Sequence, residues 1–248
     1  MFRGYRCHVR MGLAGVLSVL CLLVTGAAAR SEDKGEPAYL IRKTKGKEPT
    51  AAELEEKSAS GWTLAGVVKT GDQAGNCLCY FARNPSGKEK VKYEIVAEDK
   101  DYADAGPLNK ERGNKGWQLM CVMNLGDDQK PGPYRYVYAN RGGTHAHGIL
   151  SAPKLVPPEK LDEQWGRLGF RLVGVVHSAS DPGGFKYYIV LPGGKQVAQQ
   201  HKAVSTREPP QETKELDALA KEGWALVNIL PTGDKEQPYI FWLNRNNR

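Results

Sequence analysis

The feature that most constrains the fold of this chain is a short run that recurs four times. Each copy has a Gly, an aromatic residue and a following apolar stretch, and the copies read SGWTLAGVV, KGWQLMCVM, LGFRLVGVV and EGWALVNIL. Their glycines are Gly61, Gly116, Gly169 and Gly223, which lie 55, 53 and 54 residues apart. Such even spacing, with matching flanks, indicates four copies of one structural unit.

The residues before each of these glycines have the pattern of a helix. In the fourth copy, Leu216 and Leu219 have the i, i+3 spacing of one helical face. Thr50 and Glu53 have the spacing of a capping box at the start of the first helix, whereas Gly113 interrupts the second. A proline precedes each of the four helical stretches: Pro49, Pro107, Pro158 and Pro210. We expect the Gly after each stretch to take the left-handed conformation that closes a helix.

After each Gly the hydrophobic period changes from that of a helix to that of a strand. A polar loop and a second strand rich in aromatic and β-branched residues follow, as in CLCYFA, YRYVYA, YYIVL and YIFWL. Another short strand is expected before each helix, more clearly in AYLIRK and KYEIVAE than in HGILSA and QVAQQHKAV. The predicted fold is therefore α+β, with four tandem β-α-β-β units in which a helix packs on a small antiparallel or mixed sheet.

The predicted repeat units span residues 36–86, 91–142, 143–193 and 195–248. One such unit buries too little apolar surface to be stable alone, and its sheet has a second face and two edges that need cover. We therefore expect the units to pack two by two, as 36–142 and 143–248. The Gly- and Pro-rich stretch Asn140–Pro158 is the expected boundary between the two pairs.

The fourth copy, which reads LDALAKEGWALVNIL…YIFWLNR at Leu216–Arg245, resembles domain of unknown function 4177, a family of small bacterial modules built around a Gly-Trp-x-Leu-Val core. The first two copies are similar to the same family, and the third departs from it because Phe170 replaces the Trp. The four matches cover nearly the whole chain that follows the N-terminal residues. The resemblance implies a fold unit and no established activity, so it supplies no catalytic residues.

The N-terminal residues have the pattern of a secretory signal peptide. Three arginines precede an uncharged apolar run that ends in small residues, with Ala27 and Ala29 at the positions that a signal peptidase reads. We expect cleavage of residues 1–29 and export, either to the periplasm or by secretion. The alternative is an uncleaved N-terminal membrane anchor, since the run is nearly long enough to span a bilayer. No later stretch is apolar enough to do so.

The charge of the chain argues against one class of partner. The formal net charge of +7 falls to +4 without residues 1–29, which hold three Arg and no acid. The remaining charge is mild, is spread along the chain and lacks the clustered basic stripe that phosphate binding requires. We therefore expect no nucleic-acid partner. The sequence does not identify the partner, and the two classes of partner that we consider are a protein and a cell-envelope ligand.

Three cysteines follow the predicted signal peptide: Cys77, Cys79 and Cys121. In an oxidising compartment, a disulfide from Cys77 or Cys79 to Cys121 is one interpretation. Cys77 and Cys79 point the same way along a strand, so they do not bridge each other without strain. The other interpretation is that all three are small, buried, apolar side chains.

The Gly-aromatic pairs have a functional and a structural interpretation. The aromatic rings can form a platform on which a ligand stacks, or they can anchor the corner between helix and strand in the core. Their recurrence in every copy favours the structural role. The residues concerned are Gly61, Trp62, Gly116, Trp117, Gly169, Phe170, Gly223 and Trp224.

Tyr134, Tyr136 and Tyr138 alternate along one predicted strand, which puts three rings on one face. Exposed rings would stack on sugars or flat ligands, whereas packed rings would fill a core or an interface between units. Aromatic residues in the corresponding strands of the other copies favour packing. The three tyrosines are nevertheless the best candidates for a binding surface that the sequence offers.

His145 and His147 lie on one side of an extended segment, and His177 is a candidate third metal ligand. No sequence feature fixes their convergence, and a solvated loop is the competing interpretation. The sequence has no Gly-x-Ser-x-Gly elbow and no phosphate-binding glycine loop, and no Ser or Cys has a clear His and acid partner. We predict no catalytic residue and no cofactor.

These patterns favour an exported, non-catalytic protein that acts as a binding or scaffolding module, since tandem repeats mostly offer extended surfaces. The alternative, from a different class, is a metal-dependent or hydrolytic enzyme with its site between the pairs of units. Convergence of His145, His147 and His177 would favour the enzyme. A large exposed apolar or aromatic patch would favour the binding module.

Overall fold

The computed structural model describes residues 37–248 except 45–46, 71–75, 85–86, 127–129, 192–196, 211, 233–234 and 247–248. By their contacts, Pro37–Arg248 form one compact unit. The predicted signal peptide, residues 1–29, lies outside the described residues. Within the described part of the chain, no helix is both long enough and apolar enough to cross a membrane.

The described residues of the compact unit have a mixed α+β fold with four α-helices and four three-stranded antiparallel sheets. The first sheet holds β1 (Tyr39–Lys43), β2 (Trp62–Lys69) and β3 (Cys77–Arg83), with α1 (Ala51–Ala59) after β1. The second holds β4 (Lys92–Glu98), β5 (Trp117–Asn124) and β6 (Tyr134–Asn140), with α2 (Gly106–Glu111) after β4. The third holds β7 (Ala146–Ala152), β8 (Arg171–His177) and β9 (Phe185–Leu191), with α3 (Pro158–Gln164) after β7. The fourth holds β10 (Gln199–Thr206), β11 (Ala225–Pro231) and β12 (Tyr239–Asn246), with α4 (Lys214–Lys221) after β10.

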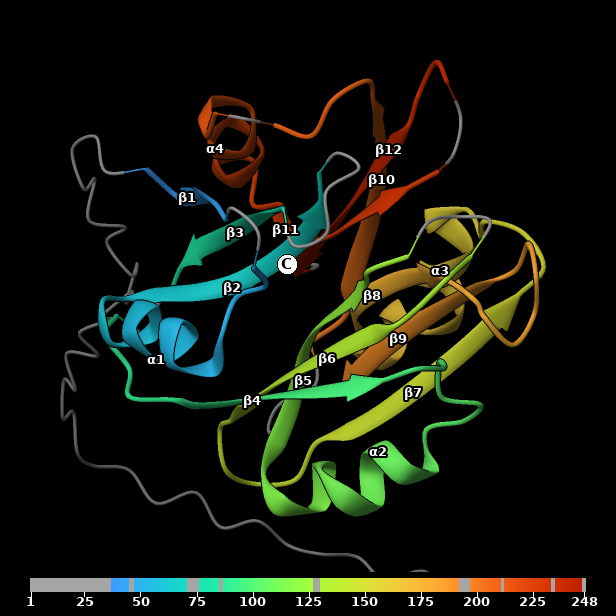
Figure 1. The fold of residues 1–248 in the computed structure, drawn as a ribbon, viewed down its shortest axis with the longest axis horizontal. Helices are drawn as coiled ribbons and strands as arrows, with labels where there is room; N and C mark the ends of the chain where they lie inside the picture. The colour runs from blue at the N-terminus through green and yellow to red at the C-terminus, as the bar shows by residue number, and fades with distance from the viewer. Residues whose placement is uncertain are drawn as a thin grey trace, which may run out of the picture. The chain divides into compact units, whose positions relative to one another are not determined.

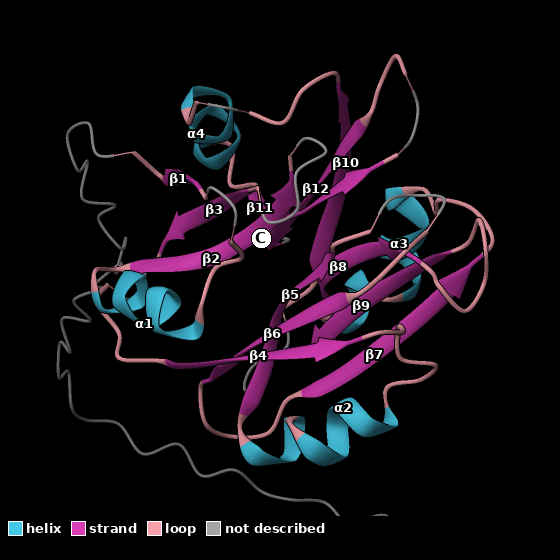
Figure 2. Cartoon of the chain, viewed as in Figure 1, coloured by secondary structure: helices cyan, strands magenta, loops and turns pink. Residues whose placement is uncertain are grey.

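In every sheet the strand that comes last in the chain lies in the centre. The orders are β1-β3-β2, β4-β6-β5, β7-β9-β8 and β10-β12-β11. We call β1, β4, β7 and β10 the leading strands and β2, β5, β8 and β11 the inner strands. Figure 1 shows the inner strands toward the middle of the compact unit and the four helices toward its rim, and Figure 2 shows the same division by secondary structure.

The helix ends follow the local sequence signals. Thr50 accepts a hydrogen bond from the Glu53 N–H and the Glu53 carboxylate accepts one from the Thr50 N–H, so the predicted capping box at the start of α1 is confirmed. The second helix breaks near Gly113, as its sequence suggests, and a 3-10 turn over Gly113–Lys115 replaces its last turn. All four glycines of the recurring run have positive φ: Gly61 at 90°, Gly116 at 83°, Gly169 at 82° and Gly223 at 88°.

The aromatic residue after each of these glycines is half-buried rather than fully enclosed. Trp62, Trp117, Phe170 and Trp224 each pack against an apolar cluster and leave part of the ring at the surface. Basic side chains cover two of the exposed faces. Arg83 lies 5.0 Å from the Trp62 ring centre, and Arg245 lies 4.3 Å from that of Trp224. The rings therefore anchor their corners from the edge of the core.

Each inner strand contains a bulge at the same place in its sequence. The register with the central strand shifts between Leu64 and Gly66 in β2, between Leu119 and Cys121 in β5, between Leu172 and Gly174 in β8 and between Leu226 and Asn228 in β11. A bulge increases the local twist of a strand and leaves the extra residue outside the ladder. The four inner strands therefore bend in the same way where they meet.

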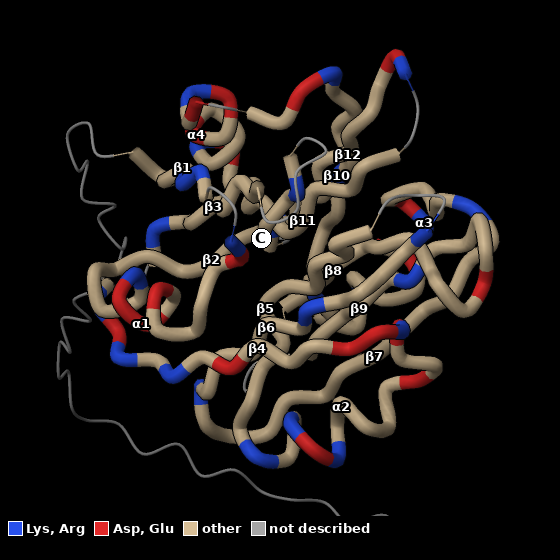
Figure 3. The backbone as a smooth tube through the Cα atoms, viewed as in Figure 1, with Lys and Arg blue, Asp and Glu red and all other residues tan. Residues whose placement is uncertain are grey.

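Among the described residues, four apolar clusters connect the sheets in a closed cycle. One cluster joins the first sheet to the second through Leu64 and Met123, and another joins the second to the third through Leu119 and Val173. A further cluster joins the third sheet to the fourth, and the last joins the fourth back to the first through the buried side chain of Tyr39. Figure 3 shows most charged residues on the helices and connections and long uncharged stretches on the inner strands.

This cycle differs from the expected arrangement of two separate pairs. The stretch Asn140–Pro158, the expected boundary, contains β7. Ile149 of β7 packs in the cluster between the second and third sheets. Because each sheet has apolar side chains on both faces, it packs against two neighbours rather than one, and residues 37–142 are not set apart from 143–248.

We predict that alanine at two of the left-handed glycines lowers the free energy of unfolding to different extents. A Cβ on Gly223 would meet only the flexible Arg245 side chain at 3.5 Å, so Gly223→Ala should cost the left-handed backbone penalty of about 1–2 kcal/mol. A Cβ on Gly116 would lie 2.9 Å from the Gly142 Cα, so Gly116→Ala should lower the free energy of unfolding further. Urea denaturation of both variants measures the difference, and equal losses would contradict the close approach of Gly142.

Candidate functional site

The three candidate binding tyrosines do not form a surface. Tyr134, Tyr136 and Tyr138 are all buried and pack between the second and third sheets. The Tyr134 hydroxyl donates to the His177 carbonyl oxygen at 2.8 Å, and the Tyr136 and Tyr188 hydroxyls lie 2.9 Å apart. The three tyrosine rings therefore fill the interface between the second and third sheets, and they expose no face on which a ligand could stack.

The three candidate metal ligands do not converge either. His145 Nε2 lies 2.9 Å from the Gly142 carbonyl oxygen, and His177 Nε2 lies 2.8 Å from that of Pro231. His147 Nε2 accepts a hydrogen bond from the Leu119 N–H at 3.1 Å. Each imidazole is buried and serves a different backbone group. In residues 37–248, apart from the gaps given above, no group of three or more His, Cys, Asp or Glu side chains could hold a metal ion.

His147 belongs to a set of residues that no short motif of the sequence reveals. Tyr39, Tyr93, His147 and His201 lie at intervals of 54 residues, one at the start of each leading strand. The backbone N–H of each donates to a polar side chain on the helix of the preceding sheet. The signal in the sequence is the interval itself, because two Tyr and then two His follow one another at 54 residues.

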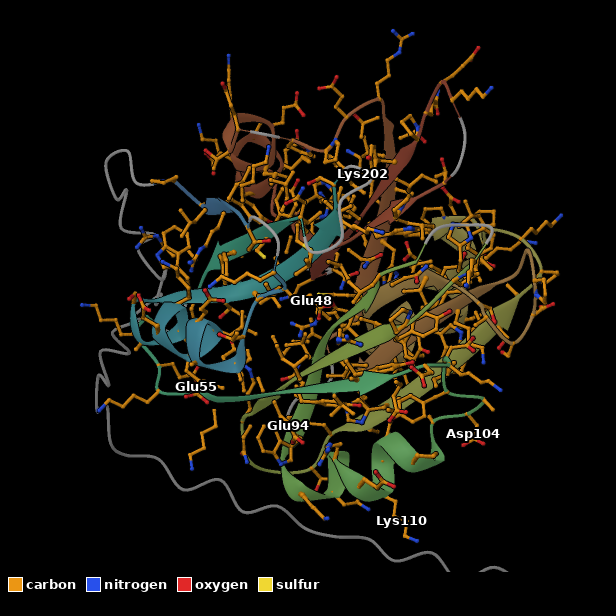
Figure 4. All side chains as sticks on the ribbon, viewed as in Figure 1. Glu48, Glu55, Glu94, Asp104, Lys110 and Lys202 are labelled. Carbon is orange, nitrogen blue, oxygen red and sulfur yellow. The ribbon has the colours of Figure 1, made fainter. Side chains whose placement is uncertain are left out.

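The helix acceptors form a second set with nearly the same interval. Glu55 accepts from the Tyr93 N–H at 3.1 Å, Asn109 from the His147 N–H at 2.6 Å and Asp162 from the His201 N–H at 2.8 Å. Asp217 of α4 accepts from the Ala38 and Tyr39 N–H groups at 2.9 and 3.1 Å. The last helix therefore holds the first strand in the way that each other helix holds the next leading strand. Figure 4 labels Glu55 on α1 above β4.

At two of the four junctions, a side chain of the leading strand also accepts a hydrogen bond from the inner strand of the preceding sheet. The Tyr39 hydroxyl accepts from the Leu226 N–H at 2.8 Å, and His147 accepts from the Leu119 N–H. Both leucines begin the bulge of an inner strand, where the ladder leaves an N–H group without its usual acceptor. In the other two sheets, the Tyr93 hydroxyl and His201 Nε2 are buried without a hydrogen-bond partner among the described residues.

The inner strands also contact one another directly after their bulges. The residues at this position are Gly66, Cys121, Gly174 and Asn228. Asn228 Oδ1 accepts from the Val175 N–H at 3.2 Å, and the Cys121 sulfur accepts from the Val67 N–H. A Cβ on Gly174 would lie 3.1 Å from the Val122 Cβ, so a larger residue would push the strands apart. Glycine therefore alternates with a side chain that accepts a hydrogen bond, and this alternation allows the four strands to meet.

All three cysteines of the described chain are free and buried in the cluster between the first and second sheets. Burial raises the pKa of Cys79 and of Cys121 to about 12. A thiol with so high a pKa holds almost no thiolate at neutral pH, which makes it a poor nucleophile. This agrees with the interpretation of the three as buried apolar side chains and not with a disulfide.

The ends of the inner strands surround a small cavity. It is lined mainly by valines of β2, β5 and β8, with the polar side chains of Lys69, Asn124 and Asn228. Its volume of about 10 Å³ is room for about one water molecule. Lys69 Nζ donates to the Leu125 carbonyl oxygen at 3.1 Å and ties the first sheet to the second at this rim. The connection that follows each inner strand leaves from this end.

A buried ion pair fixes one of these connections. The side chains of Asp101 and Lys186 are 0% and 4% exposed, and Asp101 Oδ2 lies 3.4 Å from Lys186 Nζ. Asp101 also accepts from the Ser178 hydroxyl at 2.7 Å and from the Ser180 N–H at 3.2 Å. Lys186 donates to the Tyr102 carbonyl oxygen at 2.6 Å. With its acceptors occupied and Ser178 itself buried, the group acts as a clamp between the second and third sheets.

None of the protein-family models, curated proteins or solved structures that were compared with the chain matches it. The resemblance to domain of unknown function 4177 therefore stays a prediction from the sequence.

The environment of His147 predicts how stability depends on pH. Burial, and then the nearby His145, lower the pKa of His147 from 6.5 to about 4. The unfolded chain takes up a proton on this imidazole below pH 6.5, whereas the folded chain does so only near pH 4. The stability present above pH 6.5 is therefore lost as the pH falls through this window.

We predict that His147→Gln reduces this loss, because a Gln side-chain oxygen can accept from the Leu119 N–H and does not titrate. Between pH 6.5 and 4, wild type should lose about 2–3 kcal/mol more unfolding free energy than His147→Gln. Denaturant titrations across this pH range measure both proteins. The same pH dependence in both would show that His147 is not held neutral by burial.

Proposed function

We propose that this chain is a non-catalytic binding or scaffolding module built from four copies of a β-α-β-β unit. The observation that carries the proposal is the contact between a helix acceptor and the next leading strand, which occurs at all four junctions. It includes the junction from the last helix back to the first strand. A chain held in this way is a preformed support, and it loses little conformational entropy when it binds.

The face that we propose for binding lies where the inner strands end. Lys69, Asn124, His177 and Pro231 end the four inner strands, and three of them border the small central cavity. Four polar connections therefore leave from around one point. The connection over residues 178–184 is anchored by the ion pair of Asp101 and Lys186 through Ser178 and Ser180. Loops on a rigid support are the usual place of recognition sites in proteins of this kind.

The opposite ends of the inner strands are occupied by structural groups. There the helix-closing glycines and half-buried aromatic rings make the corners, and basic side chains cover two of the rings. The proposed partner is a protein or a cell-envelope component, since the predicted export signal would bring the chain to that compartment.

Site-specific photocross-linking in cells that export the full chain tests the proposed face. A photoreactive residue at Ser180, in the anchored connection, should give one recurrent adduct with a partner. The same residue at Glu163, which is exposed on α3, serves as the matched control and should not give that adduct.

Adducts at Glu163 equal to those at Ser180 would contradict the assignment of binding to this face. A full chain that gives no adduct from either position, and that retains its fold by circular dichroism, would contradict the binding function itself.

A further inference from the structure

Arg171 stands apart from the other half-buried arginines of the described chain. Arg112 pairs with Glu94 at 2.8 Å, Arg135 pairs with Glu48 at 2.8 Å and Arg141 pairs with Glu89 at 3.2 Å. Arg245 binds Gln200 at 2.7 Å. Arg171, the first residue of β8, is also half-buried, and its backbone pairs with Val190 of β9, yet its guanidinium has no ion pair and no hydrogen bond to any described residue.

The groups around Arg171 are basic rather than acidic. Arg171 pairs with Val190, which pairs in turn with His147, so these residues lie in one row of the third sheet. The row faces the second sheet, since Val190 packs in the cluster between the two sheets. Burial, and then the charge of Arg141, lower the pKa of Arg171. Arg141 and Arg171 also contribute to lowering the pKa of His145, after the larger effect of burial.

The hydrogen bonding of this region is incomplete. His145 is 6% exposed, and its Nε2 is bonded to the Gly142 carbonyl oxygen. Its Nδ1 is buried and has no partner among the described residues. The one acid that pairs with a base here, Glu89, is shared between Arg141 and Asn84. A half-buried guanidinium beside a second cation, without an acceptor, is costly unless an anion neutralises it.

The two residues after Arg141 are glycines with open space beside them. Gly142 and Gly143 are exposed and have φ values of 68° and 69°. A Cβ on either glycine would meet nothing within 4 Å. Side chains at these two positions would fill this space and would be strained in the left-handed conformation. The space beside these two glycines, which follow Arg141 in the chain, is therefore open.

We propose that Arg171 and Arg141, beside the open segment at Gly142 and Gly143, form a binding site for a small oxyanion. The planar guanidinium presents a fork of N–H donors that matches the paired oxygens of a phosphate or a carboxylate. Such an ion would supply the acceptor that Arg171 lacks. The site is independent of the proposed function, because Arg171 begins β8 and the proposed binding face lies at its other end.

The test uses the purified full chain with inorganic phosphate and with acetate as probes, at constant ionic strength because exposed charges are screened by salt. Phosphate represents a tetrahedral oxyanion and acetate a planar carboxylate. One of the two should raise the melting temperature of wild type in a saturable way. Arg171→Gln should weaken the apparent affinity by roughly tenfold or more, since it removes charged hydrogen bonds.

Arg167→Gln is the matched control, because Arg167 is exposed four residues earlier and the variant makes the same change of charge. It should bind the probe as wild type does. Without either probe, Arg171→Gln should melt at the same temperature as wild type or higher, because it removes an uncompensated cation. The site would be overturned if neither probe changed the melting temperature of wild type. It would also be overturned if the effective probe raised the melting temperature of Arg171→Gln as much as that of wild type.

An NMR measurement keeps the test decisive if Arg171→Gln does not fold. Arginine Nε–H signals report the guanidinium directly, and the signal of Arg171 is identified by its absence in Arg171→Lys. Addition of the effective probe should shift this signal more than that of Arg167. A signal of Arg171 that does not move at saturating probe would also overturn the site.

Discussion

The fold depends on hydrogen bonds between neighbouring sheets, in which each sheet supplies acceptors for backbone N–H groups of the next one. A bulge interrupts the ladder of every inner strand, and the leading strand of each sheet needs an acceptor at its start. The helix of the preceding sheet supplies that acceptor. In two of the four junctions, the leading strand returns a hydrogen bond to the bulge through Tyr39 or His147. Buried backbone groups without partners are costly, so these contacts select one neighbour and one register for each sheet.

The apolar packing has the same cyclic character. Each sheet contributes side chains to two clusters, and the inner strands meet where Gly66 and Gly174 alternate with Cys121 and Asn228. The two glycines allow close approach, and the side chains of Cys121 and Asn228 accept N–H groups from the strands that carry the glycines. Closure around the inner strands gives every small sheet cover on both faces. A single unit with one helix could not provide this.

The parts of the fold that depend on local chemistry could be predicted from the sequence. The helix-closing role of Gly61, Gly116, Gly169 and Gly223 follows from position and residue type alone, and so does the capping box at Thr50. The closed cycle could not be predicted, because it depends on which faces of different sheets meet. Apolar residues on both faces of a strand show that two neighbours are needed and do not identify them.

The candidate site residues illustrate the same limit. Alternation places Tyr134, Tyr136 and Tyr138 on one face, but burial of that face depends on the third sheet. The interval of two residues between His145 and His147 suggested shared ligands, whereas the informative interval was the one of 54 from Tyr93 to His147 and from His147 to His201. The ion pair of Asp101 and Lys186 joins residues far apart in the chain, and no local pattern indicates it. No local pattern indicates that the Arg171 side chain lacks a partner either.

The closing junction between α4 and β1 is the most direct test of this account. Asp217→Ala removes the acceptor of the Ala38 and Tyr39 N–H groups, whereas Asp217→Asn keeps an oxygen that can accept as Asn109 does in α2. Hydrogen exchange of the β1 amides, measured with the free energy of unfolding, distinguishes the two. We predict that Asp217→Ala loses about 1–3 kcal/mol and the protection of β1, and that Asp217→Asn retains most of both. Unchanged protection of β1 in Asp217→Ala would contradict the closed cycle.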